Sequence, residues 1–232
     1  KLIRPKPGEV VEKTRKLNFL GEYNLGGEKW LIEKYLKEIG VEVNVAFTGD
    51  STVAALKKAP GSCLNIVQCT GSMHWVAQRL EQEYGIPYLD VNFFGAENTA
   101  DSLRRIAEFY GDPEISRRAE ALIARENARI EPLIARYRTK LTGKRAAIYV
   151  GGAFKAVALI RQMKDLGMEV VVTGTQTGKQ EEYETISGLL SEGTIVVDDA
   201  NPAEIERFLL DMKVDVMAGG VKERVLAYKL GI

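Results

Sequence analysis

The chain has 232 residues, of which 45% are hydrophobic and 28% are charged, and its 32 basic side chains balance its 32 acidic ones. This length allows one large domain or two of ordinary size, each with a buried core. Because nucleic acids and anionic membrane surfaces attract strongly basic proteins, the balanced charge argues against both as partners.

Cysteine usage indicates a reducing compartment. The two cysteines, Cys63 and Cys69, are too few for a disulfide scaffold. The sequence contains neither a signal peptide nor a run of about 20 apolar residues, so we expect a cytoplasmic protein. It opens with Lys1 rather than Met and stops at Ile232 without a polar tail. We therefore expect a piece of a longer chain.

From Leu17 onward, short apolar runs alternate with longer amphipathic stretches, the pattern of parallel sheets covered by helices. Residues 1–16, rich in Lys, Glu and Pro, are predicted to form a surface extension. The strands predicted in the first series cover 17–23, 41–47, 64–67 and 88–91. The helices predicted in the same series cover 28–38, 53–58, 72–83 and 100–110.

A long polar helix is predicted next, over 114–141, and Pro132 is expected to kink or split it. A second series then predicts strands over 146–150, 170–173, 194–197 and 214–218. Its predicted helices cover 155–166, 181–190, 202–212 and 222–230.

The predicted fold class is therefore α/β, with two open, Rossmann-like parallel sheets flanked by helices and joined by a long helical connector. The predicted domains are an extension at 1–16, a first α/β domain at 17–112 that carries Cys69, a connector at 113–143, and a second α/β domain at 144–232 that carries Gly151-Gly152.

Cys69 is the strongest single candidate for a metal ligand or a nucleophile. It follows a predicted buried strand and precedes a helix, where amide donors and the positive end of the helix dipole favour a thiolate. Such a thiolate could bind a metal or act as a nucleophile. The alternative is a small buried hydrophobic residue, and position alone does not decide between the two. His74 follows within the helix, and its spacing does not favour a Cys-His dyad.

Gly151 and Gly152 follow directly after a predicted strand. Their backbone amides could hold an anionic ligand at a helix start, with Lys155 adding positive charge. The alternative is a tight turn that needs two glycines. The pattern lacks the G-x-G-x-x-G dinucleotide fingerprint. Residues 174–180 imitate a phosphate-binding loop, but the spacing is one residue short and Gln180 replaces the required Ser or Thr.

Seven short segments resemble, in the same order, those of α-type chains in the nitrogenase component 1 family. The resemblance runs from about residue 17 to residue 232. The segments are LGEYNLGGE at 20–28, TGD at 48–50, LNIVQC at 64–69, YGIP at 84–87, NFFG at 92–95, DSLR at 101–104 and DLGM at 165–168.

The resemblance implies three domains of parallel sheet with an iron-sulfur cofactor lodged between them. The chain would cover the second domain and most of the third. Cys69 matches the family cysteine that ligates an end iron of the cofactor. Gly151 and Gly152 match a glycine pair that approaches the cofactor through backbone amides. Lys155 matches a basic residue after that pair if one inserted residue is allowed, because Phe154 stands there in strict register.

The residues around Cys69 depart from the catalytic α chains of the family. Those chains have His before the ligand cysteine and an aromatic residue and Arg after it, where this chain has Gln68, Thr70 and Gly71. Losing these groups removes proton donors and positive charge from the cofactor's surroundings. The resemblance therefore favours a scaffold that holds a precursor of the iron-molybdenum cofactor for nitrogen fixation.

Two alternatives stay open. The segments at 92–95 and 101–103 look closer to a catalytic α chain, which would be an oxidoreductase that reduces dinitrogen or another small molecule. A metal-free anion- or nucleotide-binding α/β module could also use Gly151-Gly152.

The resemblance also implies partners. These are a homologous β-type chain in an α2β2 assembly and a reductase iron protein. The full-length protein would hold the iron-sulfur cofactor or its precursor, and we do not expect this segment alone to bind it or to be active.

Overall fold

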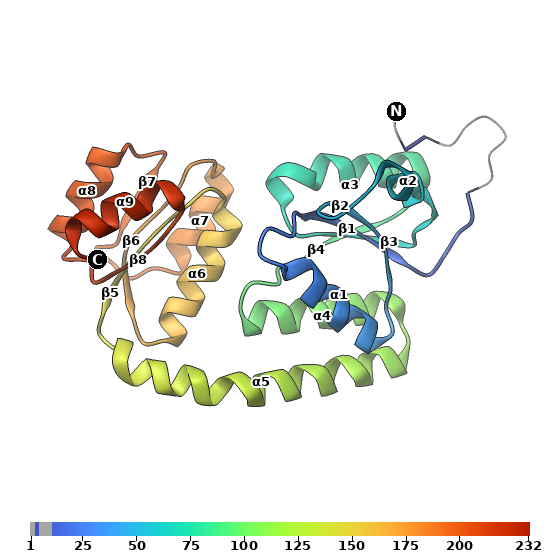
Figure 1. The fold of residues 1–232 in the computed structure, drawn as a ribbon, viewed down its shortest axis with the longest axis horizontal. Coiled ribbons are helices and arrows are strands. Elements are labelled where there is room, and N and C mark those ends of the chain that lie inside the picture. Colours follow the sequence, from blue (N-terminus) through green and yellow to red (C-terminus); the bar gives the residue numbers. More distant parts are fainter. Residues whose placement is uncertain (1–2, 5–10) are drawn as a thin grey trace. The chain divides into compact units, whose positions relative to one another are not determined.

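A computed structural model describes residues 3–4 and 11–232. Residues 1–2 and 5–10 of the predicted extension lie outside the described residues. The chain divides into two compact units, residues 1–127 and 128–232, and each contains a four-stranded parallel sheet (Figure 1). The α/β fold class with two parallel sheets is confirmed.

The first sheet has the strand order β2-β1-β3-β4. Its strands are β1 (Leu17–Glu22), β2 (Val43–Thr48), β3 (Leu64–Val67) and β4 (Tyr88–Asp90). The elements that accompany them are α1 (Glu28–Ile39), α2 (Val53–Leu56), the 3-10 turn η1 (Ala59–Gly61), α3 (Thr70–Tyr84) and α4 (Ala96–Tyr110). β1 lies between β2 and β3, which explains why all six of its residues are buried.

Helices cover both faces of the first sheet. Successive side chains of a strand point to opposite faces, so Phe19 and Leu20 enter different cores. Phe19 packs with α1 and α4, whereas Leu20 packs with Ala77 and Leu80 of α3. Figure 1 shows α3 on one side of this sheet and α1 and α4 on the other.

The segment that leads into β1 packs against the first unit. The Thr14 amide donates to the carbonyl of Gly61 (2.8 Å), and the Cys63 amide donates to the carbonyl of Lys16 (2.9 Å). The Tyr110 hydroxyl donates to the carbonyl of Arg15 (2.8 Å). Residues 14–16 are therefore bonded to the body of the unit directly before β1.

α5 (Pro113–Leu141) is a single helix with Pro132 inside it. The expectation that Pro132 could split the helix is wrong. Proline removes one backbone donor, and the carbonyl four residues earlier belongs to Ala128, which is exposed and accessible to water. The division between the two units falls within this helix, after Asn127. The four-part domain division made from the sequence stays a prediction.

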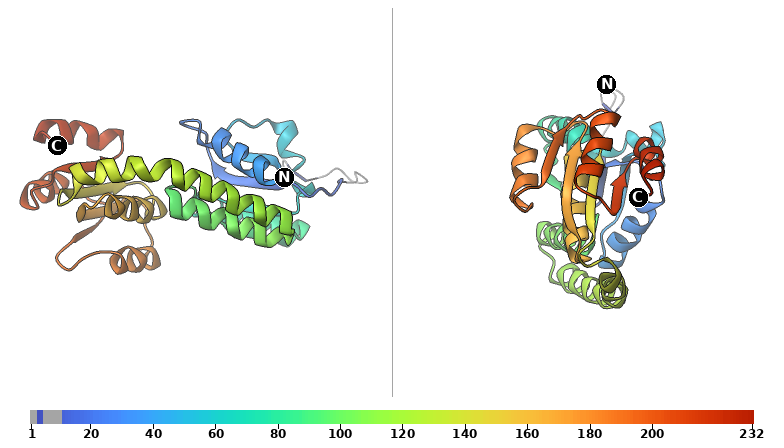
Figure 2. Two further views of the ribbon diagram at one scale, coloured as in Figure 1. Left: turned by 90° about the horizontal axis from the view of Figure 1, so that it is seen from below. Right: turned by 90° about the vertical axis from the view of Figure 1, so that its left-hand side faces the viewer.

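The second sheet has the strand order β7-β6-β5-β8. Its elements in chain order are β5 (Arg145–Val150), α6 (Ala153–Asp165), β6 (Glu169–Thr175), α7 (Gln180–Gly188), β7 (Ile195–Asp198), α8 (Pro202–Asp211), β8 (Val216–Gly219) and α9 (Val221–Leu230). One core packs α6 and α7 on this sheet, and another packs α8 and α9 on it (Figure 2).

Most predicted elements are present, and the differences lie at their ends. α3, α4 and α6 begin two to four residues earlier than predicted, at Thr70, Ala96 and Ala153. The helix predicted over 53–58 is wrong in length, because α2 ends at Leu56 and η1 follows. Pro60 lies within η1, and a proline cannot donate the hydrogen bond that would continue an α-helix.

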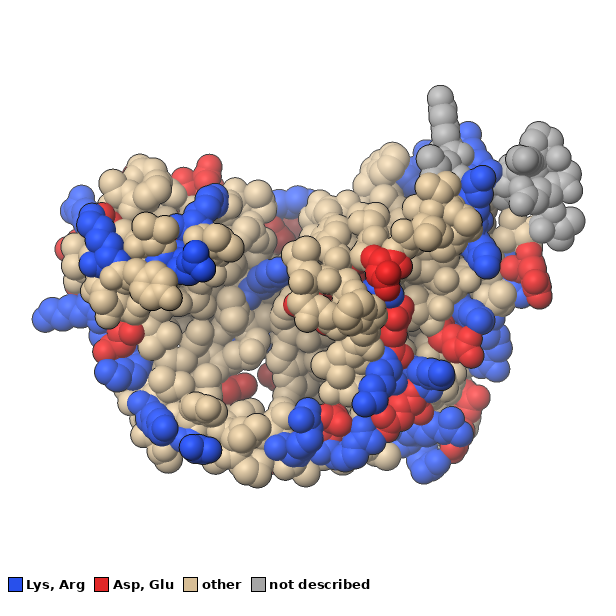
Figure 3. All heavy atoms as spheres, viewed as in Figure 1, with Lys and Arg blue, Asp and Glu red and all other residues tan. Residues whose placement is uncertain are grey.

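The described surface carries charges of both signs. Lys and Arg side chains intermingle with Asp and Glu on the face shown in Figure 3. Among the residues described, none of the helices combines the length and the apolar character needed to cross a bilayer.

A leucine in the first core tests this packing. Leu64 is fully buried, so Leu64→Ala should lower the free energy of unfolding by about 2–5 kcal/mol. Leu25 is 87% exposed, and Leu25→Ala should change the free energy of unfolding by less than about 0.5 kcal/mol. Urea unfolding followed by circular dichroism measures both values, and equal losses would contradict the core described above.

Candidate functional site

The carboxyl ends of parallel strands meet at one edge of each sheet, where open α/β folds bind their ligands. We call these the first and second carboxyl edges. At the first edge, the loops begin at Tyr23, Gly49, Gln68 and Val91. At the second edge, they begin at Gly151, Gln176, Asp199 and Gly220.

Cys69 is the N-terminal cap residue of α3 at the first carboxyl edge. Its backbone is extended (φ −114°, ψ 91°), and its carbonyl accepts hydrogen bonds from the amides of Met73 (3.0 Å) and Ser72 (3.3 Å). No side chain caps the start of this 15-residue helix. Cys69 is a free, partly exposed cysteine. Cys69 therefore lies at the positive end of the helix dipole.

Gln68 holds the loops after β3 and β4 together. It is 3% exposed, and its Oε1 accepts a hydrogen bond from the Phe93 amide (3.2 Å). The amide of Asn92 donates to Oγ of Ser102 on α4 (2.9 Å). Gln68 thus serves loop packing, and its side chain is not presented beside the Cys69 thiol as a free polar group.

The loop after β2 is bonded to the end of β1 and to α1. The Gly49 amide donates to the carbonyl of Glu22 (2.9 Å), and Nε1 of Trp30 donates to Oδ2 of Asp50 (3.1 Å). No motif in the sequence signalled these contacts, because they join residues from elements that are separate in the sequence.

His74 pairs with β4. Its Nδ1 lies 3.7 Å from Oδ1 of Asp90, and its Nε2 lies 3.4 Å from the Tyr88 hydroxyl. The rings of His74 and Tyr88 also stack edge to face, with centroids 5.1 Å apart. These contacts join His74 to β4 rather than to Cys69.

Cys63 lies at the other end of β3, one residue before the strand begins. Its thiol donates to the carbonyl of Lys16 (3.4 Å) and lies 3.6 Å from the Tyr110 hydroxyl. Burial raises the pKa of the Tyr110 phenol, with a further contribution from Cys63. The two thiols of the chain therefore stand at opposite ends of one strand.

Gly151, Gly152 and Lys155 come together at the start of α6, on the second carboxyl edge. Gly152 caps the helix without a side chain, and its carbonyl accepts from the Lys155 amide (3.1 Å). Gly151 is exposed, and a methyl group added to it would meet nothing within 4 Å. Lys155 is exposed in the first turn. Uncapped amides beside a lysine suit an anionic ligand.

The neighbouring loop resembles a phosphate-binding loop in sequence only. The Lys179 amide, at the start of α7, donates to Oε2 of Glu182 (2.7 Å). A carboxylate of the chain itself therefore occupies a donor that a phosphate would need.

Tyr183 of α7 ties the ends of β6 and β7 together. Its hydroxyl donates to Oδ1 of Asp198 (2.7 Å) and lies 2.8 Å from Oγ1 of Thr175, which is fully buried. Burial raises the pKa of the Tyr183 phenol above its ordinary value. The Tyr183 hydroxyl thus links two neighbouring strands at the second carboxyl edge.

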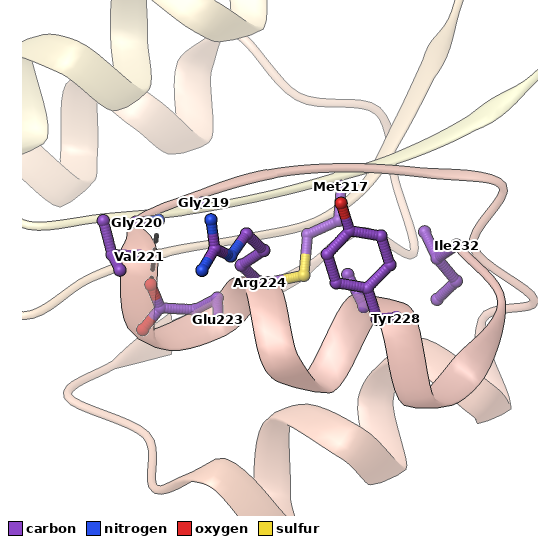
Figure 4. A pocket seen from close by; sticks show the side chains of 9 residues that line it. Met217, Gly219, Gly220, Val221, Glu223, Arg224, Tyr228 and Ile232 are labelled. Carbon is purple, nitrogen blue, oxygen red and sulfur yellow. Dashed lines mark hydrogen bonds between the residues drawn. The ribbon is translucent and has the colours of Figure 1, made fainter.

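A pocket of about 390 Å³ lies beside β8 and α9, where sequence reasoning placed no site. Arg224 and Tyr228 of α9 lie beside Met217 of β8, and the Glu223 carboxylate accepts from the Gly220 amide at 2.8 Å (Figure 4). Glu three residues after Gly220 is the sequence signal for this cap. The other lining residues are Gly219, Val221, Ala227 and Ile232.

The side chains that could act as ligands determine which kind of metal centre the chain could bind. Within the part of the chain that is described, no group of three or more His, Cys, Asp or Glu side chains could hold a metal ion. Cys69 therefore offers one soft thiolate. A single thiolate fits an iron-sulfur cluster that arrives preassembled better than a lone metal ion, which needs several protein ligands.

Comparison with known proteins gives matches along nearly the whole chain. Residues 3–232 match the family described as nitrogenase component 1 type oxidoreductase. The nitrogenase iron-molybdenum cofactor biosynthesis protein NifE of Clostridium pasteurianum is 50% identical over 221 residues, which cover 95% of this chain and 48% of that protein. The nitrogenase molybdenum-iron protein alpha chain of Methanothermobacter marburgensis is 39% identical over 217 residues, covering 93% of this chain and 45% of that protein.

Among solved structures, one described as nitrogenase Cp1 at pH 5 aligns with a TM-score of 0.85 at 31% identity. The alignment covers 97% of this chain and 51% of that chain. The chain spans about half the length of the relatives that it matches.

Tyr183→Phe tests the bracing of the second carboxyl edge. It removes the hydroxyl near the buried Thr175 Oγ1 and should lower the free energy of unfolding by about 1–3 kcal/mol. Tyr228 is 77% exposed, and Tyr228→Phe should change the free energy of unfolding by less than about 0.5 kcal/mol. Urea unfolding measures both, and an unchanged Tyr183→Phe midpoint would contradict this role.

Proposed function

Because the chain belongs to the nitrogenase component 1 family, we propose that it works as a cofactor-biosynthesis scaffold of the NifE type. In this role it holds an iron-sulfur precursor of the iron-molybdenum cofactor through Cys69. The chain spans about half the length of its relatives, so the activity and partners of the whole protein belong to the proposal as well.

The observation that carries the proposal is the set of residues around Cys69. Gln68 is buried and bonded to Phe93, Thr70 is half-buried, and Gly71 is exposed with open space around it. None of these three brings a cation or an aromatic ring to the thiol. A site that only holds a cofactor needs neither, whereas reduction of dinitrogen requires protons and positive charge near the cofactor.

Sequence identity supports the same choice. The chain is 50% identical to the NifE protein of Clostridium pasteurianum and 39% identical to the alpha chain of Methanothermobacter marburgensis, over similar lengths.

In this proposal each candidate residue has its own role toward the precursor. Cys69 supplies a thiolate ligand at the start of α3. The amides at Gly151 and Gly152, with Lys155, stabilise negative charge on the precursor without competing as ligands. When bound, an iron-sulfur cofactor supplies iron sites that exchange electrons.

We further propose a homologous β-type chain as a partner in an α2β2 assembly, with a reductase iron protein as an electron donor. A reducing cytoplasm suits this arrangement, because it keeps the Cys69 thiol available.

The second candidate is a catalytic α chain. The segment Asn92–Gly95 favours it, since its sequence looks closer to that of catalytic chains. Reduction of dinitrogen by the purified, cofactor-loaded complex would support this candidate over the scaffold.

Cys69→Ala tests the ligand directly. In the full-length protein with its partner chain, the variant should retain at most about one tenth of the precursor-derived iron, because the thiolate is the proposed ligand. The paramagnetic signature of the cluster should also disappear. Iron analysis and electron paramagnetic resonance measure these quantities. Cys63→Ser is the matched control and should retain both. Unchanged iron and spectra in Cys69→Ala would remove the basis of the proposal.

Gly151→Asp tests the anion contact. The open space at Gly151 accommodates a side chain, so the variant should fold. The added carboxylate should repel an anionic precursor and lower iron retention about fivefold, equivalent to about 1 kcal/mol. Gly151→Ala adds volume without charge and should retain iron like the unsubstituted protein. Equal retention in the two variants would argue against an anion-binding role, and phosphate binding measured by calorimetry without iron would favour the metal-free module.

A further inference from the structure

Gly21 lies directly against the backbone of Cys69. Its φ is +80°, and a methyl group built on it would lie 2.8 Å from Cβ and 2.8 Å from N of Cys69. The same methyl would lie 3.1 Å from the Cys69 Cα. These atoms belong to the backbone and to its first side-chain carbon, so they cannot turn away as the end of a long side chain could.

The contact follows from the pairing of two central strands. Leu20 of β1 is paired with Val67 of β3, and both side chains are fully buried. One residue further on, the Gln68 amide donates to the Leu20 carbonyl (2.8 Å). Because paired strands lie only about 4.8 Å apart, Gly21 is brought against Cys69 as the strands end.

Two further restraints hold Cys69 from other directions. The Cys69 carbonyl accepts from the amides of Ser72 and Met73, which fixes it at the start of α3. The preceding residue, Gln68, accepts from the amide of Phe93 through its side chain. The contact with Gly21 differs from these two, because it is possible only when residue 21 has no side chain.

We infer that Gly21 is a positioning residue for Cys69. Without a Cβ, it lets the Cys69 backbone settle against β1, which sets the direction in which the thiol leaves the start of α3. A metal ligand must be held within about 0.5 Å of its productive position, so this contact determines how well Cys69 serves as one. That last step rests on the proposed function, whereas the positioning itself rests on geometry alone.

Gly21→Ala in the full-length protein tests the inference. The methyl group should displace Cys69 away from β1 towards solvent, so alkylation of Cys69 by iodoacetamide should become at least about threefold faster. Mass spectrometry with fragmentation measures the rate at Cys69 and, in the same molecule, at Cys63. The rate at Cys63 should stay unchanged, because it lies at the other end of β3.

Gly85→Ala is the matched control. Gly85 ends the helix that Cys69 begins and has a φ of +67°, but a methyl group there would meet nothing within 4 Å. This variant carries a similar backbone strain and should lower the melting temperature without changing the alkylation rate of Cys69. A rate in Gly21→Ala equal to that in Gly85→Ala would overturn the inference.

Two further measurements separate the outcomes. If Gly21→Ala yields little folded protein, the double variant with Cys69→Gly removes the Cβ contact, although the contact with the Cys69 nitrogen remains. It should therefore yield more folded protein than Gly21→Ala, and an equal or lower yield would also overturn the inference. In the complex with the partner chain, Gly21→Ala should alter the cluster spectrum. Faster alkylation with unchanged iron and spectrum would uphold the positioning role and contradict the proposed ligand function.

Discussion

The hydrogen bond from the Gln68 amide to the Leu20 carbonyl joins β1 and β3 where both strands end, and the surroundings of Cys69 depend on it. The pairing of β1 and β3 runs from Leu17 to Leu20 without a register shift, so the two strands reach the carboxyl edge together. A slip by one residue would turn every side chain of β3 to the opposite face and would separate Gly21 from Cys69. The buried strand sequence therefore controls a position outside the sheet.

The helices at the candidate residues start without a side-chain cap, as α1 after Gly27 and α4 after Gly95 also do. α3 begins after Cys69 and α6 after Gly152, and neither helix has a side-chain cap. α8 instead begins after Asn201, whose side chain accepts from the amides of Ala203 and Glu204. A side-chain cap is worth about 1 kcal/mol, so the uncapped starts give up stability. In the proposed function, that loss leaves these helix starts without a side-chain cap that would compete with an anionic cofactor.

The same difference explains how far the sequence predicts the structure. The start of α8 at Pro202 was predicted correctly, because an asparagine followed by a proline marks a helix start. The starts of α3 and α6 were predicted too late, since neither Cys69 nor Gly152 is a usual capping signal. The α/β class and the position of Cys69 after a buried strand followed from hydrophobic patterns and from the resemblance.

Contacts between separate loops could not be predicted in this way. Nothing local to Gly21 or to Gln68 reveals that one packs against Cys69 and the other accepts from Phe93. Both contacts arise only when strands distant in the sequence pair with each other. The continuity of α5 through Pro132 likewise depended on the exposure of Ala128, which the local sequence does not report.

The order of the strands has a consequence for synthesis on the ribosome. All four described strands of the first sheet end by Asp90, and none is supplied by the second unit. Because domains fold as units from the amino terminus during translation, the first sheet can close before the second is made. Cys69 would then reach its place at the start of α3, beside Gly21, while β5 to β8 are still being synthesised.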